Sequence, residues 1–169
     1  QGSVWAPFLY SLYCHDIPLP AEPHFAGMYA DDLVYAVCHE DLSEATQTLQ
    51  ELLVVLGQWC TKWKVKINSL KSCVVTYTYN TKYEEAPVFY DGQPIPKATG
   101  HKYLGVFLDK HLTFNEHITE LISRVRSQVS RLKPLLDSRN VSVHNKIIMY
   151  KTLIVPIWTY AVNIWGTCS

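Results

Sequence analysis

The sequence predicts an α+β fold, in which short strands and helices come first and helices alone follow. Residues 25–37 contain two apolar, β-favouring runs on either side of a short acidic turn, which is the pattern of a β-hairpin. After residue 109 the apolar spacing changes to three and four, as in amphipathic helices. A chain of 169 residues with 48% apolar and 18% charged residues can bury a globular core.

Two helices are predicted on either side of the hairpin. Residues 4–14 and 41–63 both place apolar side chains at helical spacing. Gly57 is the expected weak point of the second helix, because glycine is a poor helix former. The expected caps are Ser3 for the first helix and Asp41 or Ser43 for the second.

The middle of the chain predicts further strands. Residues 64–67 alternate polar and apolar side chains, which is typical of a half-buried strand. Residues 73–79 and 103–108 favour single strands, and residues 88–95 favour a hairpin around the Asp91-Gly92 turn.

Helices alone are predicted after this point. Thr113 and Glu116 have the spacing of a capping box, and apolar residues follow at helical spacing as far as Leu132. A further helix over residues 144–153 is capped by Ser142. Pro156 starts or kinks the next helix.

The acidic turn, Asp31-Asp32, is the first candidate for chemistry. Two neighbouring like charges repel each other, so they need either solvation by water or a cation between them. Mg²⁺ prefers carboxylate oxygens and is usually held by one or two carboxylates together with substrate phosphates. The pair therefore indicates either an ordinary solvated turn or part of a phosphoryl- or nucleotidyl-transfer site.

Charge and cysteine content narrow the classes of function. The net charge is zero, but residues 1–63 hold one Lys or Arg against eight Asp or Glu, whereas residues 109–169 hold eight against four. An acidic first part and a basic remainder suit a metal site beside a phosphate-binding surface. The five cysteines lack zinc-site spacing and are expected to be reduced core residues. No apolar run is long enough to span a bilayer, so no membrane partner is expected.

Several short motifs resemble successive motifs of reverse transcriptases and occur in the same order. They are Gln1-Gly2-Ser3-Val4 followed by Ala6-Pro7, Tyr29-Ala30-Asp31-Asp32, the segment with Trp63, Ile67-Asn68 and Lys71, and Tyr103-Leu104-Gly105-Val106. The later residues resemble the thumb of non-LTR (LINE-type) retrotransposons, particularly the jockey-like group: Leu112-Thr113-Phe114, His117-Ile118, Asn145-Lys146, Tyr150-Lys151 and Pro156-Ile157-Trp158-Thr159-Tyr160.

The resemblance implies a partial polymerase palm over residues 1–108, with antiparallel strands and packed helices, followed by an α-helical thumb over residues 109–169. It implies an RNA-directed DNA polymerase that performs template-directed nucleotidyl transfer to a primer 3′-hydroxyl with two Mg²⁺ ions, or Mn²⁺. The partners would be an RNA template, a DNA primer and dNTPs. The location expected from the family is intracellular, in the nucleus, the cytoplasm or both.

The resemblance also implies roles for individual residues. Asp31 would be a metal ligand with Asp32 as its less central partner, and Lys71 would protonate or neutralise the leaving pyrophosphate. The nucleotide and template pocket would include Gln1, Gly2, Ser3 and Tyr29, and the primer grip Tyr103, Leu104 and Gly105. Arg124 and Arg131 lie seven residues apart on one helix face and are the expected contacts to the nucleic-acid backbone.

One departure from the family pattern bears on activity. The family's first metal-binding aspartate lies upstream of the Gln1-Gly2 motif, where this chain begins, so the missing palm and fingers would have to come from a longer polypeptide. The 169 residues alone are therefore expected to be inactive. Two alternatives stay open: a decayed or co-opted remnant that only binds nucleic acid, and another palm-fold enzyme such as an RNA-dependent RNA polymerase.

Overall fold

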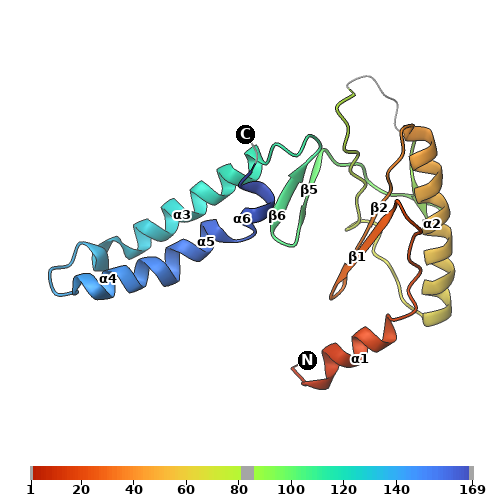
Figure 1. Ribbon diagram of the computed structural model, residues 1–169. Coiled ribbons are helices and arrows are strands. Elements are labelled where there is room, and N and C mark those ends of the chain that lie inside the picture. Colours follow the sequence, from red (N-terminus) through yellow and green to blue (C-terminus); the bar gives the residue numbers. More distant parts are fainter. Residues whose placement is uncertain (1, 81–85, 168–169) are drawn as a thin grey trace. The chain divides into compact units, whose positions relative to one another are not determined.

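The computed structural model describes residues 2–80 and 86–167 (Figure 1). The chain divides into two compact units. The first unit contains the residues up to Val74 together with Asn80–Lys97, and the second contains Val75–Tyr79 and Ala98–Ser169. Strands and helices are both present in each unit, which agrees with the predicted α+β class.

The first unit is built from two helices and two small hairpins. Its elements are α1 (Trp5–Tyr13), β1 (Phe25–Tyr29), β2 (Asp32–Ala36), α2 (Leu42–Trp63), β3 (Phe89–Tyr90) and β4 (Gln93–Pro94). The β1–β2 hairpin lies beside α2 (Figure 1). The predicted cap of α2 is confirmed, since the Asp41 side chain accepts a hydrogen bond of 2.9 Å from the Ser43 backbone N–H.

The predicted hairpin over residues 25–37 is confirmed. Its antiparallel ladder runs from the pair Phe25 and Ala36 to the pair Tyr29 and Asp32. Two residues, Ala30 and Asp31, are therefore left to form the turn. Ala30 has a φ of 52°, the positive value that two-residue hairpin turns require and that alanine adopts with some strain.

The core of the first unit lies between α2 and the hairpin. Leu56, Trp59 and Cys60 of α2 are buried together with Cys14, and the hairpin packs Leu33 and Tyr35 against them. Complete burial of an apolar side chain of this size stabilises a fold by roughly 1.5–3 kcal/mol. The inward side chains of β2 thus fix the hairpin on α2.

Asp16 ties the segment after α1 to the end of α2. Its carboxylate accepts hydrogen bonds from the indole N–H groups of Trp59, at 2.8 Å, and Trp63, at 3.1 Å. Lys62 adds an ion pair at 3.4 Å. These partners, with the Trp59 bond as the largest cause, lower the pKa of Asp16.

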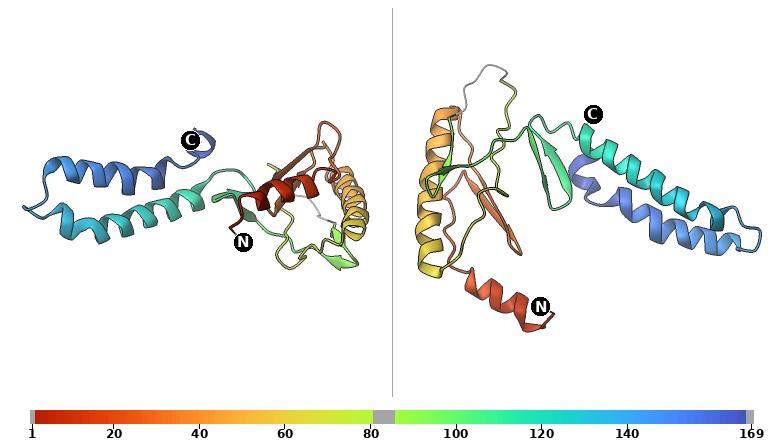
Figure 2. Two further views of the ribbon diagram at one scale, coloured as in Figure 1. Left: turned by 90° about the horizontal axis from the view of Figure 1, so that it is seen from below. Right: turned by 180° about the vertical axis from the view of Figure 1, so that it is seen from behind.

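The second unit combines one hairpin with an antiparallel helical arm. Its elements are β5 (Gly100–Tyr103), β6 (Val106–Asp109), α3 (Asn115–Leu136), α4 (Val143–Met149), the π-helix η1 (Tyr150–Ile154), α5 (Val155–Thr159) and α6 (Val162–Trp165). In both views of Figure 2, α3 runs alongside the continuous series α4, η1 and α5. None of the helices that the structure describes is long and apolar enough to cross a membrane.

Asp109, at the end of β6, holds the loop that leads into α3. Its carboxylate accepts bonds from the backbone N–H groups of His111, Thr113 and Phe114, at 3.1, 3.1 and 2.7 Å. Partial burial opposes ionisation, but these bonds outweigh it and lower the pKa of Asp109. The predicted capping box of Thr113 and Glu116 is wrong, because the Thr113 hydroxyl bonds to Asp109 and Phe114 is the N-cap residue.

The strand predictions in the middle of the chain need three corrections. Residues 64–67 are not a strand, because Lys64 adopts a left-handed C-cap and the Val65 N–H bonds back to Cys60 to close α2. Residues 73–79 form only a single bridge from Val74 to Lys97. Residues 103–108 are not one strand, because Leu104 and Gly105 both have positive φ and form the turn between β5 and β6. The predicted hairpin around Asp91 and Gly92 is confirmed.

The helix predictions need smaller corrections. Gly57 does not break α2, which runs unbroken because its neighbours Leu56 and Trp59 are buried in the core. The predicted helix over residues 144–153 is α4 followed by the π-helix η1, and Ser142 caps it as expected, accepting from the Asn145 N–H at 3.2 Å. Val4 is the N-cap residue of α1, although the Ser3 hydroxyl accepts a 3.3 Å bond from the Trp5 N–H.

We expect Asp109→Ala to destabilise the chain by about 2 kcal/mol at pH 7, because three backbone donors would no longer have a charged acceptor. The folded-state pKa of Asp109 is lowered, so this stabilisation is present above the unfolded pKa and is lost as pH falls through the folded pKa. The difference between variant and parent in urea unfolding should therefore shrink below about pH 4.

The matched control is Asp137→Ala, which removes an exposed carboxylate 3.4 Å from Lys133 at the other end of α3. An exposed pair of this kind contributes about 0.5 kcal/mol or less. Equal losses of stability in the two variants would show that Asp109 does not hold the loop before α3.

Candidate active site

The candidate site is the tip of the β1–β2 hairpin, where the Asp31 and Asp32 side chains are both exposed. Asp31 is the second turn residue, and Asp32 is the first residue of β2. Water can solvate both carboxylates at this position, which removes most of the repulsion between two adjacent negative charges. The same exposure leaves their oxygens accessible to a cation or to a substrate that carries one.

Close packing inside the hairpin supports the tip. A Cβ on Gly27 would lie 3.0 Å from the Phe25 ring and 3.2 Å from a methyl group of Val34. Only glycine therefore fits between these two side chains without displacing them. The hairpin is also fixed at its other end by the Tyr35 hydroxyl, which donates a 2.6 Å bond to the Pro18 carbonyl oxygen. Burial raises the pKa of that hydroxyl to about 12, so it stays protonated and keeps donating.

Tyr10 of α1 is a residue that the sequence analysis did not single out. Burial raises its pKa most, followed by its interactions with Cys14, and the charge of Asp31 adds to this rise. Helical spacing placed Tyr10 on α1, but no local signal relates a residue on this helix to a turn that follows it by about twenty positions.

The two carboxylates fit a hard divalent ion as part of its coordination shell. Mg²⁺ is commonly bound by one or two carboxylates, with waters and substrate phosphates as its other ligands. Within the described residues, no group of three His, Cys, Asp or Glu side chains gathers in a way that could hold a metal. The tip thus offers two carboxylate donors and no third side chain of this kind among the described residues.

Among the other predicted site residues of the first unit, Tyr29 adjoins the tip because it pairs with Asp32. No described contact brings Gly2, Ser3 or Lys71 to the tip. Gln1 lies outside the described residues. Gly2 has a φ of 95° with open space around it, and Ser3 and Tyr29 are exposed. Lys71 is exposed in a turn where its backbone N–H donates to Asn68, and no described hydrogen bond or ion pair joins it to either aspartate.

The predicted primer-grip residues form the turn of the β5–β6 hairpin in the second unit. Tyr103 pairs with Val106, so Leu104 and Gly105 make a two-residue turn. Their φ values are 46° and 85°. The turn is partly exposed, with 37% of the Leu104 surface accessible.

Arg124 and Arg131 are both exposed on α3. The neighbouring ion pairs use other cations, namely Lys102 with Glu120 at 2.6 Å and Lys133 with Asp137 at 3.4 Å. The Lys102 bond is the main cause that lowers the pKa of Glu120, and the charge of Arg124 contributes to it. The two arginines are therefore accessible, although Arg124 lies in the field of Glu120.

His117 of α3 is a second residue whose place the sequence did not reveal. It is 2% exposed, and its Nδ1 accepts a 3.4 Å bond from the Phe107 backbone N–H. The neutral ring then carries its proton on Nε2, which has no partner among the residues that the structure describes. Burial is the main cause that lowers the pKa of His117. The charge of Glu120 opposes this effect, and the charges of Lys102 and Arg124 add to it.

Comparison with known proteins identifies the family. The family described as reverse transcriptase (RNA-dependent DNA polymerase) matches residues 1–108. The probable RNA-directed DNA polymerase from transposon X-element of Drosophila melanogaster is 36% identical over 171 residues, covering 98% of this chain and 19% of the relative. The RNA-directed DNA polymerase from mobile element jockey of Drosophila funebris is 36% identical over 177 residues, covering 100% of this chain and 19% of the relative.

The chain thus spans about a fifth of the length of these curated relatives. No solved structure matches it. The predicted resemblance is confirmed, and the relatives are RNA-directed DNA polymerases by name rather than RNA-directed RNA polymerases. The chain belongs to the reverse transcriptase (RNA-dependent DNA polymerase) family, among the polymerases of jockey-like, non-LTR retrotransposons.

Proposed function

We propose that this chain supplies the metal-binding hairpin and the primer-holding part of an RNA-directed DNA polymerase of a jockey-like retrotransposon. The observation that carries the proposal is the exposed pair Asp31 and Asp32 on the two-residue turn of a hairpin packed firmly on α2. Rigid support matters, because nucleotidyl transfer depends on holding charge and reacting atoms in one geometry. The substrates would be an RNA template, a DNA primer and dNTPs.

Asp31 and Asp32 would hold divalent metal, with Asp31 as the principal ligand. Mg²⁺, or Mn²⁺, would lower the pKa of the primer 3′-hydroxyl and neutralise charge on the triphosphate. The two aspartates supply oxygen ligands at an exposed position, and the turn fixed by Gly27 and the β2 contacts keeps those ligands in place. A complete two-metal site would need a further carboxylate, so we expect the 169 residues alone to bind Mg²⁺ weakly and to incorporate no nucleotide.

The remaining site residues have supporting roles in this proposal. Lys71 would reach the leaving pyrophosphate, which its exposed position in a turn permits. Gln1, Gly2, Ser3 and Tyr29 would line the nucleotide and template pocket. Tyr103, Leu104 and Gly105 would hold the primer end. In this proposal residues 1–108 act as a palm and residues 109–169 as a thumb. The β5–β6 hairpin nevertheless belongs to the same compact unit as the helices that follow it.

A second candidate function is nucleic-acid binding without catalysis. The exposed arginines of α3 and the basic excess of residues 109–169 favour it, because both suit contacts to phosphates of any sequence. The two candidates differ in whether the aspartates matter for synthesis.

We expect Asp31→Asn to lower the rate of nucleotide addition by about a thousandfold, since metal charge stabilisation is worth several kcal/mol and each 1.4 kcal/mol is tenfold. Asp32→Asn should cause an equal or smaller loss. The assay is primer extension by a chimera in which this chain replaces the matching stretch of the jockey polymerase. Asp91→Asn is the matched control, because Asp91 is an exposed carboxylate in another hairpin turn of the same unit. Parental activity in the Asp31 variant would exclude the tip as the metal site.

We expect simultaneous Arg124→Ala and Arg131→Ala to weaken primer–template binding equally for all sequences. The slope of log affinity against log salt should flatten by about 0.9 for each phosphate that the variant no longer neutralises, on the scale measured for B-DNA. The control is Arg126→Ala with Arg139→Ala, which changes the net charge by the same amount. If both pairs flatten the slope equally, the arginines act through total charge and do not bind particular phosphates.

A further inference from the structure

We propose that Tyr160 is a positioning residue for the primer end: its hydroxyl holds the Leu104-Gly105 turn on the helical arm formed by α3 to α6. The inference rests on the proposed primer-grip role of residues 103–105. Tyr160 lies at the end of α5, in a segment that carries no assigned role in the proposed function. All residues involved belong to the second unit.

The turn itself has a conformation that its sequence does not favour. Leu104 has a φ of 46°, a left-handed value that few residues other than glycine adopt readily. Gly105, with a φ of 85°, adopts its own positive value without strain. A strained residue of this kind persists only where its surroundings determine it, and such residues concentrate at functional sites. A contact that holds the Leu104 carbonyl group would therefore stabilise a turn whose conformation is strained.

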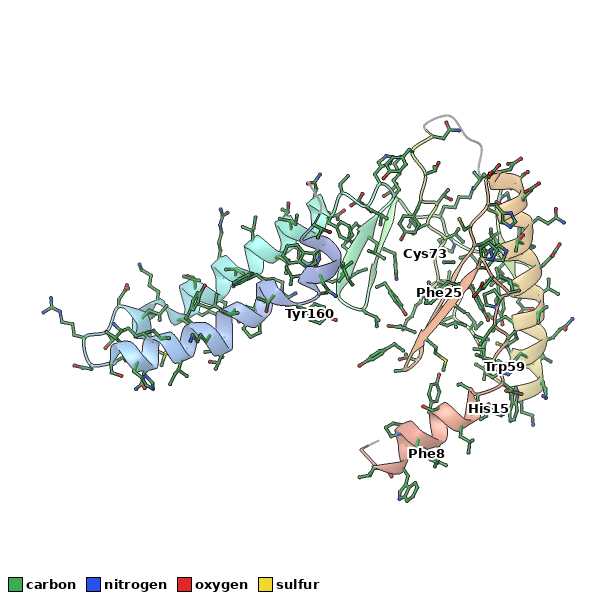
Figure 3. The ribbon with its side chains drawn as sticks, viewed as in Figure 1. Phe8, His15, Phe25, Trp59, Cys73 and Tyr160 are labelled. Carbon is green, nitrogen blue, oxygen red and sulfur yellow. The ribbon has the colours of Figure 1, made fainter. Side chains whose placement is uncertain are left out.

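Tyr160 provides that contact. Its hydroxyl donates a 2.7 Å hydrogen bond to the Leu104 carbonyl oxygen, across 56 positions of sequence. Its ring also closes the space over Gly105, where an added Cβ would lie 3.2 Å from a ring carbon. Figure 3 shows Tyr160 at the end of the β5–β6 hairpin. One side chain thus contacts both residues of the turn.

Tyr160 is held in place by contacts that return to the same hairpin. The Trp165 indole N–H donates a 2.9 Å bond to the Tyr160 carbonyl oxygen. The Trp165 ring meets the His117 ring edge-on, with centroids 5.8 Å apart, and His117 accepts from the Phe107 N–H in β6. These contacts form a closed circuit from the turn, through α6 and α3, back to the hairpin.

The consequence is that the turn moves with the helical arm. A primer end that rests on residues 103–105 would be oriented by the arm that also carries Arg124 and Arg131. Small errors in orientation slow a reaction more than they weaken binding, because overall affinity comes from many backbone contacts. Tyr160 should therefore affect the rate of nucleotide addition more than the binding of primer–template.

The test is Tyr160→Phe in the jockey chimera, which removes one oxygen atom and keeps the ring. Since 54% of Tyr160 is exposed, its hydrogen bond is an ordinary one, and its loss should lower kcat about fivefold. The KM for primer–template should stay within about twofold. Tyr150→Phe is the matched control, because it deletes a hydroxyl from an exposed tyrosine of η1 in the same arm. A loss of kcat no larger than that of Tyr150→Phe would overturn the inference.

Gly105→Ala separates failure of this inference from failure of the primer grip, because it strains the turn directly. If Gly105→Ala slows extension and Tyr160→Phe does not, the primer grip stands and the role of Tyr160 is refuted. If neither slows extension, the primer-grip assignment and the inference that rests on it both fail.

A readout without catalysis is hydrogen exchange in the 169-residue chain. The amides of Gly105 and Val106 should exchange about fivefold faster in Tyr160→Phe than in the parent, while the amides of α2 stay unchanged. Unchanged exchange at Gly105 and Val106 would show that the hydroxyl does not hold the turn.

Discussion

The pairing of Tyr29 with Asp32 is the constraint on which the candidate site depends. It closes the β1–β2 ladder and leaves only Ala30 and Asp31 for the turn. Because the turn is so short, the two acidic residues must be adjacent at an exposed tip. A shift of register by one residue would reverse the faces of β2 and move Leu33 and Tyr35 away from α2. The packing that stabilises the unit and the placement of the carboxylates therefore specify the same register.

The acidic and basic groups of the proposed polymerase lie on different units. The pair Asp31 and Asp32 lies on the first unit, within residues 1–63, where acidic residues far outnumber basic ones. The exposed arginines lie on α3 of the second unit. Neither set of charges is buried, so neither carries a large desolvation penalty. Asp16 and Asp109, which are partly buried, each have several hydrogen-bond donors around them.

Much of the fold could be predicted from local pattern. The hairpin, the long helices and the caps Asp41 and Ser142 all depend on residues close together in sequence. The strand prediction for residues 64–67 failed because alternating polar and apolar side chains indicate only a half-buried segment. Such a pattern does not show whether another strand lies beside it. The predicted capping box of Thr113 failed for a similar reason. The carboxylate of Asp109, four residues earlier, accepts hydrogen bonds from both the backbone N–H and the hydroxyl of Thr113.

The site was predictable in part. The acidic turn was predicted from its motif and is a hairpin tip. Residues 103–105 were singled out by their motif, but their turn was missed, because the apolar run over 103–108 predicted a single strand. The contacts that hold these turns join residues far apart in sequence, such as Tyr160 with Leu104. No periodicity or propensity reports such a contact, because it arises only when distant segments pack.

The most direct test of the central claim is to locate the metal-binding residues by NMR. Mn²⁺ is added below stoichiometric amounts to the ¹⁵N-labelled 169-residue chain, because the paramagnetic ion broadens the amide signals nearest to it. Broadening should be strongest from Ala30 to Leu33 and should disappear in Asp31→Asn. Broadening centred on another carboxylate, such as Asp91, or unchanged by the Asp31 substitution, would show that Asp31 does not hold the metal.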